Sequence, residues 1–200
     1  APFTRSSAPP TRPAIPTTSA TIVSAVTHAY IAMRQAGAMF TPDISRAAEQ
    51  IGALLRERGE TVAVAEGSAG GLISAALLSV PGASAYYLGG TVIYTATAGR
   101  AWMAGEVEVP TGMRGATEAF AAYLATSVRL KVGATWGVGE AGAAGPANPY
   151  GDPAGHTWLA VDGPRSVTRN VLTGLDDRSE NMMAFTAATL ELFAEALTAA

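Results

Sequence analysis

Short apolar runs alternate with longer segments of helical periodicity along most of this sequence, and this alternation constrains the fold more than any other feature. Runs of this length are typical of buried strands, and apolar residues spaced three and four apart are typical of helices that bury one face. Strands that alternate with helices predict an α/β domain. The predicted strands are 61–65, 91–96 and 134–142, and the helices between them are 70–80 and 117–133.

The last part of the sequence predicts that the sheet is mixed rather than purely parallel. The runs at 156–163 and 166–174 lie close together and predict a hairpin of antiparallel strands, and an amphipathic helix is predicted at 178–200. The expected architecture is therefore a single three-layer domain in which helices flank a mixed sheet. Trp136 and Trp158 lie within strand patterns and are expected in its core.

A helix with clear end signals precedes the first predicted strand. Thr41 is the expected N-cap, Pro42 suits the first helical position, and Gly59 ends the helix. The residues expected on its buried face are Ile44, Ala47, Ala48, Ile51, Leu54 and Leu55.

The composition excludes several classes of function. The chain has 200 residues, 48% of them apolar, and a formal net charge of −3, so it lacks the basic surface of a general nucleic-acid-binding protein. It contains no cysteine, which excludes disulfides, thiolate metal sites and cysteine nucleophiles, and His28 and His156 are too few for a histidine-rich metal site. No apolar run is long enough to span a bilayer. We therefore expect no transmembrane segment, no metal and no cofactor.

The first forty residues differ in composition from the rest. Residues 1–18 are rich in Pro, Ser and Thr and contain no acidic residue, which predicts an extended tail. Residues 19–40 are predicted to add one helix with His28 on its face, and residues 41–200 to form the α/β domain. The leader begins with Ala, contains Arg and Ser and is similar to a processed transit sequence, which predicts a mitochondrial location; the alternatives are a disordered tail and a cytoplasmic protein. An ordered tail would be expected to lie along another protein subunit.

Two loops of small residues follow predicted strands. The glycine loop, residues 67–71 of "AEGSAGG", lies between a strand and a helix, where free amides favour anions such as phosphate. It has neither the Gly-Lys-Ser/Thr of a Walker loop nor the G-x-G-x-x-G dinucleotide spacing, and small residues also serve close helix–strand packing, so both interpretations stay open. The proline loop, residues 139–155, offers Glu140 and Asp152 as acids, with no base beside them in the sequence.

Residues 43–197 resemble the CinA C-terminal domain family of nicotinamide mononucleotide deamidases through six motifs in order. The family motif A-E-S-C-T-G-G matches "AEGSAGG", and "VPGAS" is kept. G-G-x-V-x-Y-S-N-x-x-K matches "GGTVIYTATAG", and a helix start with Thr-Glu matches "ATEAFAAYLA". T-G-x-A-G-P matches "AGAAGP", and P-x-G-T-V-x-x-A matches "PAGHTWLAV". The resemblance implies the family fold and an amide hydrolysis that releases ammonia by means of a serine nucleophile and a lysine.

The resemblance, carried over residue by residue, implies that the reacting groups are lost. Gly67 stands at the position of the serine and Gly99 at that of the lysine. Other departures are Ala69 and Ala141 in place of threonines, and Met182 in place of the second arginine of a C-terminal pair. The positions that still match are Glu66, Gly70, Gly71, Tyr94, Gly142, Gly145, Pro146 and Arg178.

Neighbouring residues are weak substitutes for the lost groups. Ser68 follows the serine position, but a step of one residue at a helix start rotates the side chain by about 100°. Arg100 adjoins the lysine position, yet a guanidinium stays protonated and is a poor base, and Lys131 lies on a different helix. If the site were active, Ser68, Tyr94 and His156 would be the candidates, with His156 as the base for Ser68.

These features predict a pseudoenzyme of the family that serves as a structural or accessory subunit of a larger assembly. Other protein subunits would bind through the N-terminal extension, and self-association, common in the family, is a further expectation. One alternative is an active amidohydrolase that uses Ser68. The other is a nucleotide-binding module without turnover, with a pocket formed by Glu66, Ser68, Gly70, Gly71, Tyr94, Gly142, Gly145 and Arg178.

Overall fold

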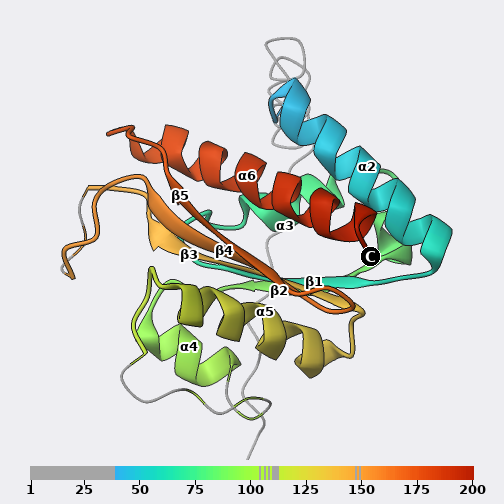
Figure 1. Cartoon of the computed structure of the whole chain (residues 1–200), viewed down its shortest axis with the longest axis horizontal. Helices are drawn as coiled ribbons and strands as arrows, with labels where there is room; N and C mark the ends of the chain where they lie inside the picture. The colour runs from blue at the N-terminus through green and yellow to red at the C-terminus, as the bar shows by residue number, and fades with distance from the viewer. Residues whose placement is uncertain are drawn as a thin grey trace, which may run out of the picture. The chain divides into compact units, whose positions relative to one another are not determined.

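A five-stranded sheet lies at the centre of the computed structural model, in the order β2-β1-β3-β4-β5 (Figure 1). β1 (Val62–Glu66) is parallel to β2 (Tyr87–Val92) on one side and to β3 (Trp136–Ala143) on the other. β4 (His156–Asp162) and β5 (Val167–Leu172) continue the sheet as antiparallel strands. The predicted mixed sheet and C-terminal hairpin are therefore confirmed.

The structure describes residues 39–103, 105, 107, 109, 113–146, 148 and 150–200. Residues 40–200 form one compact unit, and the fold is that of this unit. The predicted tail, the helix predicted within residues 19–40, and His28 lie outside the described residues.

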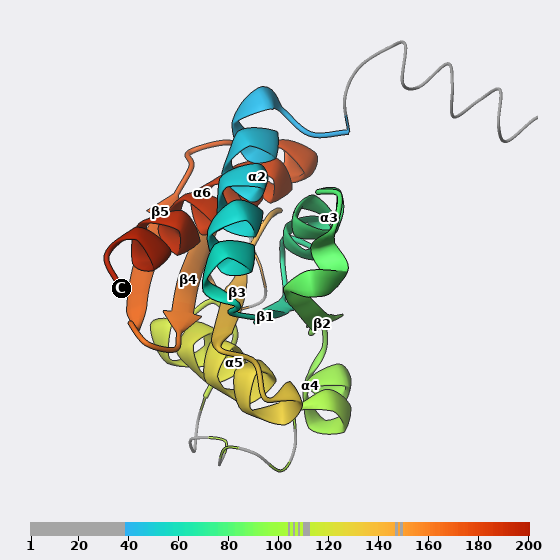
Figure 2. The ribbon, with the colours of Figure 1, turned by 90° about the vertical axis from the view of Figure 1, so that its right-hand side faces the viewer.

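Helices cover both faces of the sheet (Figures 1 and 2). One face carries α2 (Pro42–Arg58), α3 (Leu72–Leu78) and α6 (Arg178–Thr198), and a short 3-10 turn, η1 (Ala83–Ala85), leads into β2. The other face carries α4 (Ala96–Trp102) and α5 (Glu118–Val132). Each face therefore has its own apolar cluster, as expected for a three-layer α/β domain.

The end signals of α2 act as predicted. The Thr41 hydroxyl accepts a hydrogen bond from the Ile44 amide at 3.4 Å, and Gly59 ends the helix in the left-handed region at a φ of 64°. Four of the six residues expected on the buried face are buried, and Ala47 and Leu54 are partly exposed at its edge: the buried ones are Ile44, Ala48, Ile51 and Leu55.

Glycines in β3 let α5 approach the sheet closely. A Cβ at Gly139 would lie 2.7 Å from the Ala125 amide nitrogen, which a real side chain could not tolerate. On the opposite face, Trp136 is fully buried and its ring lies 5.8 Å from that of Phe193, in an edge-on arrangement. The expected burial of Trp136 is confirmed, whereas Trp158 is only partly buried at the edge of the α5 cluster.

The prediction was wrong about the strand after α3. The strand expected at 91–96 spans Tyr87–Val92, and the segment that follows it forms α4. Gly89 and Gly90 precede the expected strand, yet they lie inside β2, where a Cβ at Gly90 would come within 3.0 Å of the Val64 carbonyl oxygen. Thr95 caps α4 by accepting a hydrogen bond from the Ala98 amide at 3.1 Å.

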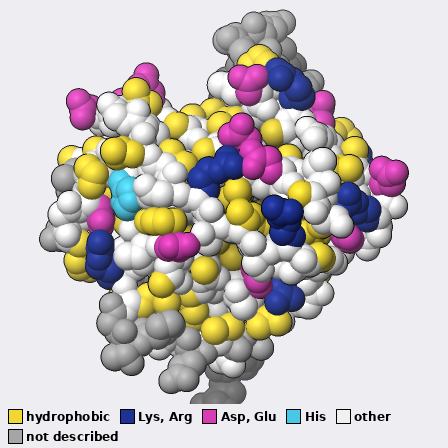
Figure 3. Space-filling model, in the orientation of Figure 1, with side chains coloured by type: hydrophobic (Ala, Val, Ile, Leu, Met, Phe, Trp, Pro, Cys, Tyr) yellow, Lys and Arg dark blue, Asp and Glu magenta, His cyan; other side chains and the backbone are white. Residues whose placement is uncertain are grey.

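Charged side chains of both signs are interspersed on the face seen in Figure 3. No large area of one sign gathers over any of the elements that the view shows. Within the described residues, no helix has both the length and the hydropathy needed to cross a membrane.

Candidate functional site

The glycine loop is held in place by Glu66, the last residue of β1. The Glu66 carboxylate accepts hydrogen bonds from the amides of Gly71, Ile73 and Ser74 at 2.9, 3.1 and 3.0 Å, and from the Ser74 hydroxyl at 2.6 Å. These amides belong to the start of α3, where an anion would otherwise bind. The protein's own carboxylate therefore takes up these donors, which favours the packing interpretation of the glycine loop over the phosphate-binding one.

A second buried carboxylate, Glu140 of β3, takes up the donors at the other end of the glycine loop. It accepts hydrogen bonds from the amides of Gly67 and Ala69 at 3.1 and 2.8 Å, and from the Thr157 hydroxyl at 2.6 Å. The Ser68 hydroxyl also donates to it. Burial raises the pKa of the Glu140 carboxyl, and the hydrogen bonds from Ser68 and Thr157 oppose this shift.

The pairing of β1 with β3 places Glu66 directly opposite Glu140. Both carboxylates are completely buried. Each is satisfied by N–H and O–H donors of the same loop region, in agreement with the rule that buried charges require hydrogen bonds. The two glutamates therefore fix the shape of the glycine loop from the buried side, where the sheet lies.

A cleft of about 1130 Å³ opens above this loop. Its described lining comes from the first two residues of the glycine loop, the segment from Ile93 to Arg100, Val109 and the residues from 113 to the first turns of α5, the end of β3 with the residues that follow it, and Arg178. A cleft of this size is large enough for a small-molecule ligand. Of the site residues expected from the sequence, those that line it are Gly67, Ser68, Tyr94, Gly99, Ala141, Gly142, Gly145 and Arg178.

Four other expected site residues lie away from the described lining of the cleft: Glu66, Gly70, Gly71 and His156. Glu66 is buried beneath the loop, and Gly70 and Gly71 shape the entry to α3 at φ values of 68° and 102°. A Cβ at Gly70 would lie 2.7 Å from the Met182 Cε, so the residue that replaces the second arginine packs over the loop.

Arg178 joins three parts of the cleft wall. It is the first residue of α6, and its guanidinium donates to the Gly145 carbonyl at 2.7 Å and to the Tyr94 hydroxyl at 3.2 Å. The guanidinium carbon also lies 5.9 Å from the centroid of the Tyr94 ring, in cation–π range. Tyr94 itself is 66% exposed, so this pair presents an aromatic and cationic surface to the cleft.

Asp152 and His156 form a separate polar group. Asp152 is buried and accepts a hydrogen bond from Arg114 at 2.6 Å, which lowers the pKa of its carboxyl. The His156 Nδ1 lies 3.9 Å from an Asp152 oxygen, and its Nε2 lies 2.8 Å from the Asn170 side-chain nitrogen. The structure thus bonds His156 to Asn170 and Ser68 to Glu140, with an Asp152 oxygen 3.9 Å from the imidazole, and among the described residues no hydrogen bond joins Ser68 to His156.

Sequence reasoning missed several residues of this site. Thr157 and the role of Glu140 depend on the register between β3 and its neighbours, which no local pattern specifies. Phe120 and Tyr123 line the cleft from α5, and their spacing of three residues in a predicted helix was a usable signal that they share a face.

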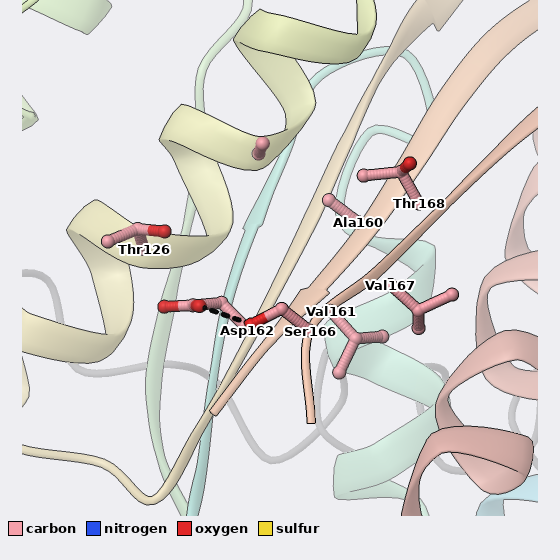
Figure 4. A pocket seen from close by; sticks show the side chains of 8 residues that line it. Thr126, Ala160, Val161, Asp162, Ser166, Val167 and Thr168 are labelled. Carbon is pink, nitrogen blue, oxygen red and sulfur yellow. Dashed lines mark hydrogen bonds between the residues drawn. The ribbon is translucent and has the colours of Figure 1, made fainter. Parts of the chain in front are cut away.

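A smaller hollow of about 220 Å³ lies between α5 and the β4–β5 hairpin (Figure 4). Its polar groups bind one another, since Asp162 accepts hydrogen bonds from Ser166 at 3.0 Å and from Arg129 at 2.7 Å. Among the described residues, no cluster of three or more His, Asp or Glu could hold a metal ion. The large cleft is therefore the candidate site.

The fold and the cleft define an α/β domain whose cleft is formed by segments at the ends of parallel strands. Residues 44–197 match the family model of the CinA C-terminal domain, and the chain belongs to this family.

Known proteins agree with this assignment. A CinA-like protein of Synechocystis sp. is 34% identical over 140 residues, which are 70% of this chain and 34% of that protein. A CinA-like protein of Frankia casuarinae is 42% identical over 120 residues, which are 59% of this chain and 28% of that protein. The chain thus spans at most about a third of these two relatives.

The crystal structure of the competence/damage inducible protein CihA from Agrobacterium tumefaciens has the same fold. It superposes with a TM-score of 0.73 at 28% identity, covering 81% of this chain and 99% of that one.

Proposed function

We propose that this domain binds an anionic small molecule in its cleft and does not carry out the amide hydrolysis of its family. The observation that carries the proposal is which groups accept the hydrogen bonds of the glycine loop. Its hydroxyl and amide donors bind Glu66 and Glu140, while the open cleft beside them is lined by arginine, tyrosine and glycine. The binding space is therefore kept, and the groups that would react are not.

The proposed loss of amide hydrolysis is supported at the two positions where the family has its serine nucleophile and its lysine. Gly67 and Gly99 line the cleft without side chains, so neither a nucleophile nor an amine base projects from them. Ser68 is a poor replacement because its hydroxyl donates to a carboxylate that is buried beneath the loop. The Gly67 and Ala69 amides also donate to that carboxylate, so they are not free to stabilise an oxyanion.

The active alternative is tested by ammonia release from nicotinamide mononucleotide. We expect no release above background from the wild type or from Ser68→Ala. Activity in the wild type that Ser68→Ala abolishes would refute the proposal.

Ligand binding is tested by calorimetric titration with nicotinamide mononucleotide and its reduced form. We expect saturable binding of at least one, weakened by Arg178→Gln, since this arginine lines the cleft. Arg165→Gln is the matched control, because Arg165 is an exposed arginine that donates to the Ala199 carbonyl instead. If neither nucleotide binds, the proposal fails.

A role as an accessory subunit, with a mitochondrial location, is the second part of the proposal. It is supported by the Pro-rich, acid-poor composition of residues 1–18 and their similarity to transit sequence. Light scattering of the full chain, alone and after co-purification from its native source, measures the association. A monomer that co-purifies with no other subunit would remove this part while leaving the ligand-binding proposal intact.

A further inference from the structure

We infer that the cleft takes a dinucleotide, which is two mononucleotides joined through their phosphates, in preference to a single mononucleotide. This inference rests on the proposed binding function and specifies the class of its ligand. It follows from the size of the cleft, from the aromatic side chains on two of its walls and from its arginines. The glycine loop does not supply the binding groups, because amides of this loop already donate to Glu66 and Glu140.

The cleft is larger than a single mononucleotide requires. Its volume of about 1130 Å³ exceeds the roughly 300–1,000 Å³ of pockets that enclose ligands of drug size, to which a mononucleotide belongs. The space is open because many of the described lining residues are glycine or alanine, among them Gly67, Gly99 and Ala141. A ligand that left part of this space unfilled would lose the contacts that the walls can make. A ligand with two parts can fill it.

Aromatic side chains lie on two walls of the cleft. On one wall, α5 presents Phe120 and Tyr123, whose ring centroids lie 6.2 Å apart at an interplanar angle of 17°. The Tyr123 hydroxyl donates to the Met103 carbonyl at 3.1 Å, which holds this pair in place. On another wall, the segment between β2 and α4 presents Tyr94, which is 66% exposed and has no ring contact with the α5 pair in the described structure. Because nucleotide rings stack on aromatic side chains, the cleft offers surfaces for two of them.

The arginines of the cleft supply charge for the phosphates that join the two halves. The Arg178 guanidinium donates to the Gly145 carbonyl and to the Tyr94 hydroxyl. The Arg100 guanidinium donates to the Thr97 hydroxyl at 3.3 Å, and none of the described lining residues is an aspartate or glutamate. A diphosphate bridge has a charge of about −2, close to that of a terminal phosphate, so the arginines accept either one. The preference for a second ring therefore comes from the aromatic walls.

Nicotinamide adenine dinucleotide and its two halves, nicotinamide mononucleotide and adenosine monophosphate, form a matched set of probes. In calorimetry with the full chain, the dissociation constant of the dinucleotide should be at least about tenfold lower than that of the half that binds more tightly, because the second half binds at a high effective concentration once the first is bound. The dinucleotide carries no more negative charge than adenosine monophosphate. Attraction to the arginines alone would therefore not give this difference.

Phe120→Ala should reduce the advantage of the dinucleotide to less than about threefold, because one of the two ring surfaces is lost. Tyr94→Ala should have the same effect, and the exposure of Tyr94 means that this variant leaves the core intact. Leu130→Ala is the matched control, since Leu130 is an exposed apolar residue of α5 outside the described lining, and it should leave the advantage unchanged. Thermal unfolding checks that all three variants are folded.

An advantage of less than about tenfold in the wild type would overturn the inference and leave the binding proposal standing, because a single nucleotide would then be enough to occupy the cleft. An advantage that survives both Phe120→Ala and Tyr94→Ala would also overturn it, since the second ring would not be bound by these walls. If neither the dinucleotide nor either half binds, the inference and the binding proposal fail together.

Discussion

Replacement of Glu140 tests whether the buried carboxylate holds the glycine loop together. Glu140→Ala removes the acceptor for two hydroxyls and two amides. The Gly67 amide keeps a partner, because it also donates to the Glu140 backbone carbonyl at 2.9 Å, but no such second bond supports the Ala69 amide in the described structure. A buried donor left alone costs about 1–3 kcal/mol, and loss of the charge-assisted bonds brings the expected destabilisation to about 3–5 kcal/mol.

Thermal and urea unfolding measure this loss. For a domain of this size the melting temperature should fall by roughly 6–20 °C, at about 2–4 °C per kcal/mol. Glu140→Gln is the matched control. Its carbonyl can face the amides of Gly67 and Ala69, while its NH₂ group donates to the hydroxyl oxygens of Ser68 and Thr157, so we expect a loss of at most about 1–2 kcal/mol. If Glu140→Ala were as stable as Glu140→Gln, the conclusion that the Glu140 carboxylate holds the glycine loop in place would be refuted.

The difference in the free energy of unfolding between the wild type and Glu140→Gln is expected to depend on pH. Because burial raises the pKa of Glu140 above its ordinary value of 4.5, the folded state binds this proton more tightly than the unfolded state. The stabilisation is fully present below that value and is lost as the pH rises through the folded pKa. In urea unfolding from about pH 4 to about pH 8, the free energy of unfolding of the wild type should therefore fall relative to that of Glu140→Gln. A difference that grows with pH would contradict this assignment.

Three other variants give independent checks. The double variant Gly67→Ser, Gly99→Lys has room for both side chains, since the nearest atoms to the added Cβ atoms lie 3.4 and 3.7 Å away, and it should release ammonia from nicotinamide mononucleotide at least about 10²-fold above the uncatalysed background; release no faster than that background would show that more than these two groups is missing. Gly139→Ala should lower the free energy of unfolding by about 3 kcal/mol or more, while Gly89→Ala, which meets nothing within 4 Å, serves as the nearly neutral control. Asp152→Asn should lower stability at neutral pH, because the lowered pKa of the Asp152 carboxyl stabilises the fold when the group is ionised; the difference from the wild type is full above the ordinary carboxyl pKa of 3.8 and is lost as the pH falls through the lower folded pKa.

Helix ends could be predicted because their signals are local. Thr117 caps α5 by accepting a hydrogen bond from the Phe120 amide at 3.3 Å, and Gly133 ends it at a φ of 66°. Both signals can be recognised in the sequence, because a threonine stands just before the apolar helical pattern and a glycine just after it. The position of β2 could not be predicted in this way, since Gly90 is required by the Val64 carbonyl of a neighbouring strand rather than by its own segment.

The order of the motifs was enough to predict several residues that line the cleft, but it did not predict which groups these residues bind. Gly67 and Gly99 are far apart in sequence and line one cleft, as the resemblance implied. The partner of Ser68 was outside the reach of sequence reasoning, because Glu140 meets the glycine loop only through the parallel register of β1 and β3. A contact between residues far apart in sequence can be recognised only once the pairing of the strands is known.

The two buried glutamates explain how the glycine loop keeps its shape independently of any substrate. An α-helix that starts beside buried strands needs acceptors for its first amides, and Glu66 provides them whether or not a substrate is present. Glu140 does the same for the residues before the helix. Because these amides already have acceptors, the function proposed above places the anionic end of a ligand on the arginines of the cleft wall.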